Sequence, residues 1–217
     1  MLGILGGSFD PVHHGHLRLA VELRQDLGLS EVRLVPSNLP PHRAPPLAAA
    51  QQRLDMLRVA VAGEPGLVVD ECEIRRGGVS YTIDTLISLR AELGSRPLCL
   101  ILGMDAFLGL HTWRRWRELI TLAHLVVAHR PGWDAAAATG EIAVLLAAQR
   151  ADGPHQLAAQ AAGLILCRPL PQLDISSSRI RALLAQGKSA RYLAPDATLD
   201  MARGIYAPAA AHPIIQS

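Results

Sequence analysis

A pair of glycines and three closely spaced histidines mark the segment GGSFDPVHHGH, residues 6–16. The apolar run before it, residues 2–5, is typical of a buried strand, and apolar residues at helical spacing follow from Leu17. Glycines allow close backbone approach and positive φ, and the first N–H groups of a helix attract anions. We therefore interpret residues 6–16 as a phosphate loop between a strand and a helix that begins near His14 or Gly15.

His13 and His16 lie three positions apart, which places both side chains on one face of the first helical turn. Imidazole or imidazolium groups there can donate hydrogen bonds to oxygens that gain charge during phosphoryl or nucleotidyl transfer. A metal site and ordinary surface histidines are the alternatives, although an HxxH pair without a third ligand nearby is weak evidence of metal binding. The loop lacks both the Walker pattern and the dinucleotide pattern GxGxxG.

A second segment suited to anions lies near the C-terminus, at ISSSRIR, residues 175–181. Its serines supply a helix N-cap and extra donors, and Arg181 lies about one turn into the helix, where a guanidinium can reach a phosphate. Taken alone, the segment fits an ordinary capped helix with surface arginines equally well. An α/β sheet would bring both helix N-termini to the same edge, so we expect residues 175–181 to lie close to the phosphate loop.

Further side chains suit a nucleotide or an aromatic ring. Thr82 is expected to cap a helix, and Asp105, just after a strand, suits ribose hydroxyls. Trp113 suits stacking on a ring. Core packing is the alternative for this residue, and we expect either Trp113 or Trp116, which we place in the same helix, to belong to the core.

The elements that would position these residues alternate along the chain. We expect buried strands at residues 2–5, 32–35, 67–69, 98–102, 125–128 and 164–166. We expect helices at residues 17–27, 52–62, 82–93 and 176–186, and two surface helices between 135 and 162. This alternation predicts a parallel sheet covered on both faces, with ligands outside the carboxyl ends of its strands. The piece at 36–46 is proline-rich like a linker, but Asn38, His42 and Arg43 favour a functional loop.

Length and composition limit the class of protein. The 217 residues, half of them hydrophobic, suit one sizeable domain, which we place at 1–205 with a helical part from about 176 and a poorly ordered tail at 206–217. A net charge of +2 gives no sign of nucleic-acid binding. The apolar runs are too short to span a membrane. The three cysteines form no CxxC pair and are read as buried thiols, so we expect a cytoplasmic protein.

The string GGSFDPVHHGHL resembles the HxGH signature of the nucleotidyltransferase superfamily and, in its full length, the bacterial nicotinate mononucleotide adenylyltransferases. The ISSSRIR segment resembles that family's ISSTxIR signature, with Ser178 where threonine is usual. The strings SYT, LGMD, LHTW and RPG, and the loop at 36–43, resemble the same family, so the likeness extends to about residue 203. The resemblance implies an α/β, Rossmann-like doubly wound parallel sheet with a small C-terminal helical part.

The resemblance also implies roles for individual residues. The catalytic pair would be His16 and His13, which contact the α-phosphate of ATP, while Ser177, Ser178 and Arg181 hold its β- and γ-phosphates. The full set implied for ATP is Gly7, Ser8, Phe9, His13, His16, Gly103, Asp105, Ser177, Ser178 and Arg181. The set implied for the mononucleotide is Asn38, His42, Tyr81, Thr82, Trp113 and Arg130.

The implied reaction joins ATP and nicotinate mononucleotide to give deamido-NAD and pyrophosphate, a step of NAD biosynthesis. The mononucleotide phosphate is already a nucleophile, so positioning and charge stabilisation should supply the catalysis. Mg²⁺ is expected to travel with ATP, with no tightly bound cofactor and no protein metal site. We expect neither nucleic acid nor membrane as a partner and leave homo-oligomer formation open.

Two other functions compete with this interpretation. One is a related adenylyl or cytidylyl transferase, such as one acting on phosphopantetheine, which Trp113 and the SYT string disfavour. The other is a regulatory module that binds ATP without turnover, which the combination of His13, His16 and Arg181 disfavours. Preference for nicotinate over nicotinamide stays open, because the resembling family recognises the acid form largely through backbone amides.

Overall fold

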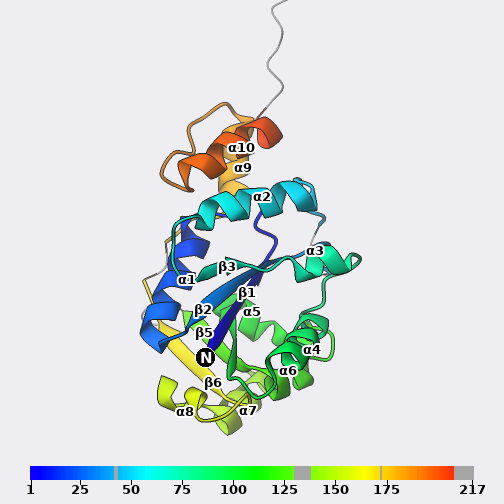
Figure 1. The fold of residues 1–217 in the computed structure, drawn as a ribbon, viewed down its shortest axis with the longest axis vertical. Helices are drawn as coiled ribbons and strands as arrows, with labels where there is room; N and C mark the ends of the chain where they lie inside the picture. Colours follow the sequence, from blue (N-terminus) through cyan, green and yellow to red (C-terminus); the bar gives the residue numbers. More distant parts are fainter. Residues whose placement is uncertain (42–43, 130–137, 172, 208–217) are drawn as a thin grey trace, which may run out of the picture.

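A six-stranded parallel sheet forms the centre of the molecule in the computed structural model, which describes residues 1–41, 44–129, 138–171 and 173–207 (Figure 1). The strands are β1 (Leu2–Gly7), β2 (Glu31–Pro36), β3 (Leu67–Val69), β4 (Leu98–Gly103), β5 (His124–His129) and β6 (Ile165–Pro169). Their order is β3-β2-β1-β4-β5-β6, and every neighbouring pair is parallel. This is the order of doubly wound dinucleotide-binding folds, so the predicted Rossmann-like sheet is confirmed.

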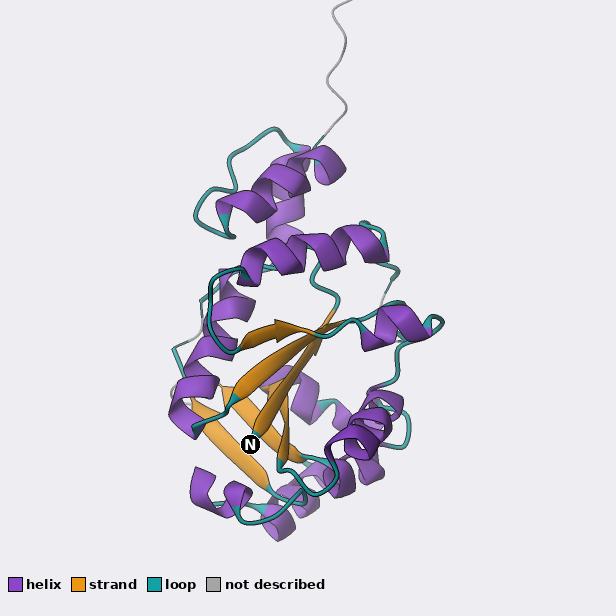
Figure 2. Cartoon of the chain, viewed as in Figure 1, coloured by secondary structure: helices purple, strands orange, loops and turns teal. Residues whose placement is uncertain are grey.

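Helices cover both faces of the sheet (Figure 2). One face packs against α1 (His14–Leu27), α2 (Ala50–Val61) and α8 (Pro154–Ala158). The other packs against α4 (Thr82–Leu93), α5 (Met104–Leu108), η1 (Leu110–Thr112), α6 (Trp116–Leu122) and α7 (Gly140–Gln149). The short α3 (Cys72–Arg76) follows β3. With both faces buried, the strands read as continuous apolar runs, which is why the sequence located them well.

Two helices form a layer beyond α2, at the top of Figure 1: α9 (Ser177–Ala185) and α10 (Asp196–Tyr206). Their apolar sides pack with Met56 of α2 in a separate cluster that includes Ile180, Leu199 and Tyr206. This is the predicted C-terminal helical part. The sequence interpretation placed no helix at α10, and it assigned Tyr206, which is buried at the end of that helix, to the tail.

Some expectations need correction. The helices α7 and α8 exist, but Ile142, Leu146 and Leu157 are buried, so these helices contribute to the core as well as to the surface. Cys99 is buried, whereas Cys72 and Cys167 are only half-buried. Among the described residues, no helix is long and apolar enough to cross a membrane.

Candidate nucleotide site

The loop after β1 reverses direction at a phenylalanine. Gly6 and Gly7 belong to the strand and pair with Val35 and Pro36 of β2, so the expectation of positive φ at these glycines is wrong. The left-handed residue is Phe9, at φ 48°, and its ring is buried. A Cβ on Gly7 would lie 3.2 Å from that ring, while a Cβ on Gly6 would meet nothing within 4 Å. Gly6 therefore leaves open space at the carboxyl end of the central strand.

The structure brings His13 and His16 together at the start of α1. His13 is the N-cap residue, in an extended conformation, and the helix begins at His14. The two rings stack with their centroids 3.7 Å apart and their planes at 23°. The buried Phe9 ring packs edge to face with the His16 ring, with centroids 5.1 Å apart and planes at 79°.

Both imidazoles are neutral at neutral pH. Burial, and to a lesser extent the neighbouring His14, lowers the pKa of His13 to about 4. Burial and then His13 lower the pKa of His16 to about 3. The Nδ1 atoms of both rings are buried without a hydrogen-bond partner among the described residues. Each neutral ring carries a single N–H donor, and neither is a strong base.

The glycine between the histidines makes room for the first ring. A Cβ on Gly15 would lie 3.0 Å from both Cε1 and Nδ1 of His13. That is closer than the 3.5–4.0 Å or so at which carbon atoms pack without repulsion. Gly15 thus allows the stacked arrangement. His14, the first residue of α1, donates its backbone N–H to Leu193 O at 3.0 Å. This N–H is therefore not free to bind a phosphate, so fewer backbone donors are free at the helix start than the sequence predicts.

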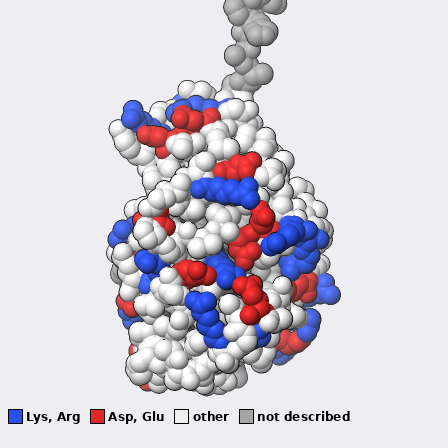
Figure 3. Space-filling view, in the orientation of Figure 1, with Lys and Arg blue, Asp and Glu red and all other residues white. Residues whose placement is uncertain are grey.

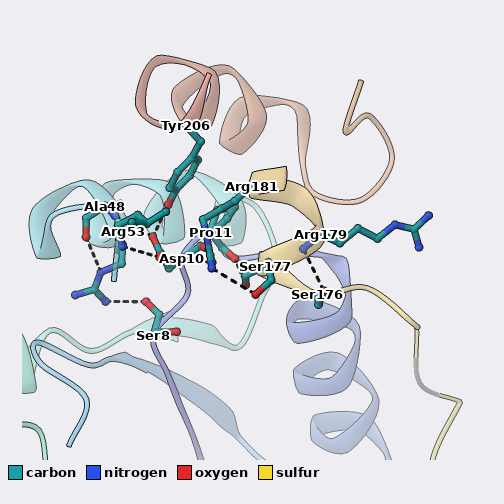
Figure 4. A network of polar contacts seen from close by, with 12 residues as sticks. Ser8, Asp10, Pro11, Ala48, Arg53, Ser176, Ser177, Arg179, Arg181 and Tyr206 are labelled. Atoms are coloured by element: carbon teal, nitrogen blue, oxygen red, sulfur yellow. Dashed lines mark hydrogen bonds and ion pairs between the residues drawn. The ribbon is translucent and has the colours of Figure 1, made fainter. Parts of the chain in front are cut away.

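The ISSSRIR segment docks on the phosphate loop, as expected (Figure 4). Ser176 caps α9 by accepting the Arg179 N–H at 3.2 Å. Ser177 donates its hydroxyl to Pro11 O at 2.8 Å. Arg181 donates Nη1 to Asp10 O at 2.6 Å, and its Nη2 lies 3.3 Å from Ser178 Oγ. The segments from opposite ends of the chain therefore form one surface.

Asn38 and Tyr81 lie in segments that are tied together. The Asn38 backbone N–H donates to Ser80 Oγ, and its side-chain Nδ2 donates to Gly78 O, both at 2.8 Å. The Arg114 guanidinium lies 4.6 Å from the centroid of the Tyr81 ring. The loop after β2, the start of α4 and the turn before α6 thus meet in one region.

Three predictions in this region have mixed outcomes. The predicted N-cap role of Thr82 is wrong: Tyr81 is the N-cap residue, its backbone is extended, and no side chain bonds the cap. Trp116 is the core tryptophan and Trp113 is half-buried, so the expectation that one of the two is core is confirmed. They do not share a helix, since Trp113 is the C-cap residue that follows η1, whereas Trp116 is the first residue of α6.

Gly103 and Asp105 lie at the same edge of the sheet as the phosphate loop. Gly103 ends β4, the strand beside β1, and is exposed. Asp105 is exposed in the first turn of α5, a position open to a ribose. His42 and Arg130 lie outside the described residues.

A buried polar group of three residues, one of them in the phosphate loop, had no role assigned from the sequence. Asp10, Arg53 and Tyr206 are all less than a tenth exposed. Arg53 donates to Ser8 O at 2.7 Å and to Asn38 O at 3.1 Å, so it links the phosphate loop to the loop after β2. Burial lowers the Arg53 pKa, while the nearby Asp10 charge acts in the opposite direction. The available sequence signal was Arg53 itself, a charged residue that lies among the buried apolar positions of α2.

Charges on the surface are mixed. On the face drawn in Figure 3, positive and negative side chains lie interspersed. Arg33, for example, pairs with Glu31 at 3.0 Å, Asp70 at 3.5 Å and Glu92 at 3.0 Å. Within the described ranges, no group of three His, Cys, Asp or Glu side chains is arranged to hold a metal ion.

The family match and the similar relatives of this doubly wound chain place it among the nucleotidyltransferases. Residues 4–183 match the family described as cytidylyltransferase-like. A relative from Methylococcus capsulatus is 50% identical over 202 residues, 93% of this chain and 96% of its own length. One from Aeromonas hydrophila is 49% identical over 210 residues, 96% of this chain and 98% of its own. Both carry the name "Probable nicotinate-nucleotide adenylyltransferase".

Solved structures share the fold at low identity. The structure titled "Plasmodium falciparum nicotinic acid mononucleotide adenylyltransferase complexed with NaAD" superposes with a TM-score of 0.67 at 15% identity, covering 92% of this chain and 93% of that one. This match supports the fold, and the close relatives establish the family. The chain belongs to the nicotinate-nucleotide adenylyltransferases, within the cytidylyltransferase-like family.

Proposed function

We propose that this chain transfers the adenylyl group of ATP to nicotinate mononucleotide, giving deamido-NAD and pyrophosphate for NAD biosynthesis. One observation carries the proposal most strongly: the His13–His16 pair and the segment from Ser177 to Arg181 converge on the same turn after β1. Asn38 and Tyr81 lie in joined segments beside it. Relatives at about half identity that carry this activity in their names support the choice of acceptor.

In the proposed reaction, a phosphate oxygen of the mononucleotide attacks the α-phosphorus of ATP. The new P–O bond forms as the bond to the oxygen bridging the α- and β-phosphates breaks, and that oxygen leaves with pyrophosphate. The attacking phosphate needs no deprotonation by the chain at neutral pH, so no general base is required. This agrees with the low pKa values of His13 and His16, which make them poor bases.

The histidines act instead as neutral donors. The N–H of His16, with His13 as the second contact, hydrogen-bonds the α-phosphate oxygens as their charge grows in the transition state. Ser177, Ser178 and Arg181 hold the β- and γ-phosphates. Gly7, which ends β1, and the next two residues, Ser8 and Phe9, complete the proposed ATP site. Mg²⁺ enters as its complex with ATP, consistent with the habit of this ion of using few protein ligands.

The remaining residues select the two nucleosides. Asp105 and Gly103 contact the ribose side of ATP, while Tyr81, Thr82 and Trp113 frame the pyridine ring. The half-buried state of Trp113 leaves part of its ring available for stacking. Asn38, in the loop after β2, lines the cleft for the dinucleotide product. His42 and Arg130 complete the set of residues that bind the mononucleotide. We place this single nucleotidyltransferase domain at residues 1–206, one residue beyond the boundary expected from the sequence, because Tyr206 ends α10 and is buried.

A pyrophosphate-release assay with different acceptors tests the function. With ATP and Mg²⁺, we expect pyrophosphate release with nicotinate mononucleotide, and the rate with nicotinamide mononucleotide measures the preference between the two acceptors. Release with phosphopantetheine alone would assign the chain to a different transferase. ATP binding without release for any acceptor would support a regulatory module.

A further inference from the structure

Asp10, a residue of the phosphate loop, contacts three distant parts of the chain (Figure 4). Its carboxylate is 4% exposed. It accepts the backbone N–H of Leu47 at 2.9 Å and of Ala48 at 3.1 Å, which fixes it to the entrance of α2. The hydroxyl of Tyr206 donates to Asp10 Oδ1 from the end of α10. The Asp10 carboxylate is therefore hydrogen-bonded by two segments, residues 47–48 and Tyr206, that lie far apart in the sequence.

The same residue supports the second signature segment. Arg181 donates Nη1 to the backbone carbonyl of Asp10 at 2.6 Å, and this nitrogen lies 3.5 Å from Asp10 Oδ2. Any movement of Asp10 would therefore move the guanidinium proposed to hold the β- and γ-phosphates. The next residue, Pro11, accepts the Ser177 hydroxyl, so two of the three side chains proposed to hold these phosphates, Arg181 and Ser177, are hydrogen-bonded to Asp10 and Pro11.

Tyr206 is built to hold the carboxylate in place. Tyr206 is 8% exposed and belongs to the same buried apolar cluster as Met56, Leu199 and Ala202. Burial, together with the Asp10 hydrogen bond and charge, raises the pKa of the phenol, so the hydroxyl keeps its proton and remains a donor. A hydrogen bond from a neutral donor to a carboxylate is stronger than one between neutral groups.

We propose that Tyr206 is a positioning residue for adenylyl transfer, acting through Asp10 to fix the turn that carries Arg181 and Ser177. This inference rests on the proposed function. It makes α10, the last helix of the described chain, part of the triphosphate-binding apparatus, although Tyr206 itself touches no substrate. Tyr206 bonds Asp10 and not Asn38, whose backbone is held by Ser80 and Arg53, so the mononucleotide side should change less than the phosphate side.

Tyr206→Phe tests the idea, because it keeps the ring packing and removes only the donor. Tyr192→Phe is the matched control, since Tyr192 is a 78% exposed tyrosine in the same C-terminal part. We expect Tyr206→Phe to raise the Kd for ATP and to lower kcat, each by about tenfold, the size of effect of one lost hydrogen bond to a charged group. The KM for nicotinate mononucleotide should stay within about twofold of the wild-type value, and Tyr192→Phe should match the wild type throughout.

A double-variant cycle shows whether Tyr206 acts through Asp10. Adding Tyr206→Phe to Asp10→Asn should cost less than it does in the wild type, because the partner is already altered. Full additivity, or wild-type Kd and kcat in Tyr206→Phe, would overturn the proposal. So would a Tyr206→Phe protein with a lower Tm but unchanged ATP binding and kcat, which is the signature of a purely structural role.

Failure of the proposed function gives a different result. In that case the wild type binds ATP but releases no pyrophosphate with nicotinate mononucleotide. The Kd comparison still decides the role of Tyr206, since it needs no acceptor: weaker ATP binding in Tyr206→Phe supports the positioning role, and equal binding contradicts it.

Discussion

His13 and His16 stack face to face, with ring centroids 3.7 Å apart, at the point where the first helix begins. The contact depends on Gly15, because a side chain there would push against the His13 ring. Burial keeps both rings neutral, with pKa values of about 4 and about 3. The HxGH spacing thus produces two neutral N–H donors side by side, which can stabilise a phosphate oxygen as its charge grows.

Replacing His16 by alanine should lower kcat by about two orders of magnitude or more, because the donor that strengthens in the transition state is lost. The free energy of unfolding should change little. His155→Ala is the matched control, since His155 is an exposed histidine in α8. Steady-state kinetics and urea unfolding of both variants provide the measurement. Near-normal turnover in His16→Ala would remove His16 from the catalytic role.

Gly15→Ala should lower kcat while the protein stays folded. The added methyl would lie 3.0 Å from the His13 ring and force it out of the stack, and we expect a loss of about tenfold or more, as for a displaced catalytic group. Gly204→Ala serves as control, because a Cβ at Gly204, in α10, would meet nothing within 4 Å. Wild-type kcat in Gly15→Ala would mean that the stacked geometry does not matter.

Acid should destabilise the fold through these histidines. Their pKa values in the folded state lie below the ordinary 6.5, so the unfolded chain binds more protons. The contribution of the two histidines to the free energy of unfolding is therefore fully present above about pH 6.5, and it is lost as the pH drops towards about 4. Urea unfolding of the wild type and of His16→Ala at several pH values should give a shallower fall in the variant. His124, whose pKa burial also lowers, is present in both proteins and does not affect the difference. Parallel curves would contradict the shifted pKa of His16.

Trp113→Ala should weaken binding of the mononucleotide more than binding of ATP. The ring is half-buried and adjoins Arg114, which lies over Tyr81, and loss of a stacked aromatic side chain costs about 0.5–1.5 kcal/mol beyond its buried area. Michaelis constants for the two substrates, measured separately, test this. Equal changes in both constants would indicate that Trp113 supports the structure instead of the pyridine ring.

Features with a local cause were accessible from the sequence. Apolar runs such as residues 98–102 marked the strands because a doubly covered parallel sheet buries both sides of each strand. Ser176 was recognisable as an N-cap because capping depends on adjacent residues. The convergence of the two signature segments followed from sheet topology, since both occur at strand ends.

Features that depend on distant contacts were missed. Tyr206 and Asp10 are 196 positions apart, and nothing near either residue announces their hydrogen bond. The positive φ occurs at Phe9, where ring burial offsets the backbone strain, and not at the glycines that tolerate it more easily. The N-cap at Tyr81 has no capping side chain, so the hydroxyl of Thr82 was a misleading signal.

The proposed reaction is defined by the phosphorus atom of ATP that is attacked, the α-phosphorus, and by the attacking group, the phosphate of the mononucleotide. Incubation with nicotinate mononucleotide, Mg²⁺ and ATP carrying a radioactive label at the α-phosphate, followed by chromatography, tests it most directly. We predict that the label appears in deamido-NAD, with one pyrophosphate released for each dinucleotide formed, and that ATP labelled at the γ-phosphate delivers its label only to pyrophosphate. Label from the γ-phosphate in the pyridine product, or no labelled dinucleotide with active, ATP-binding protein, would contradict adenylyl transfer to this acceptor.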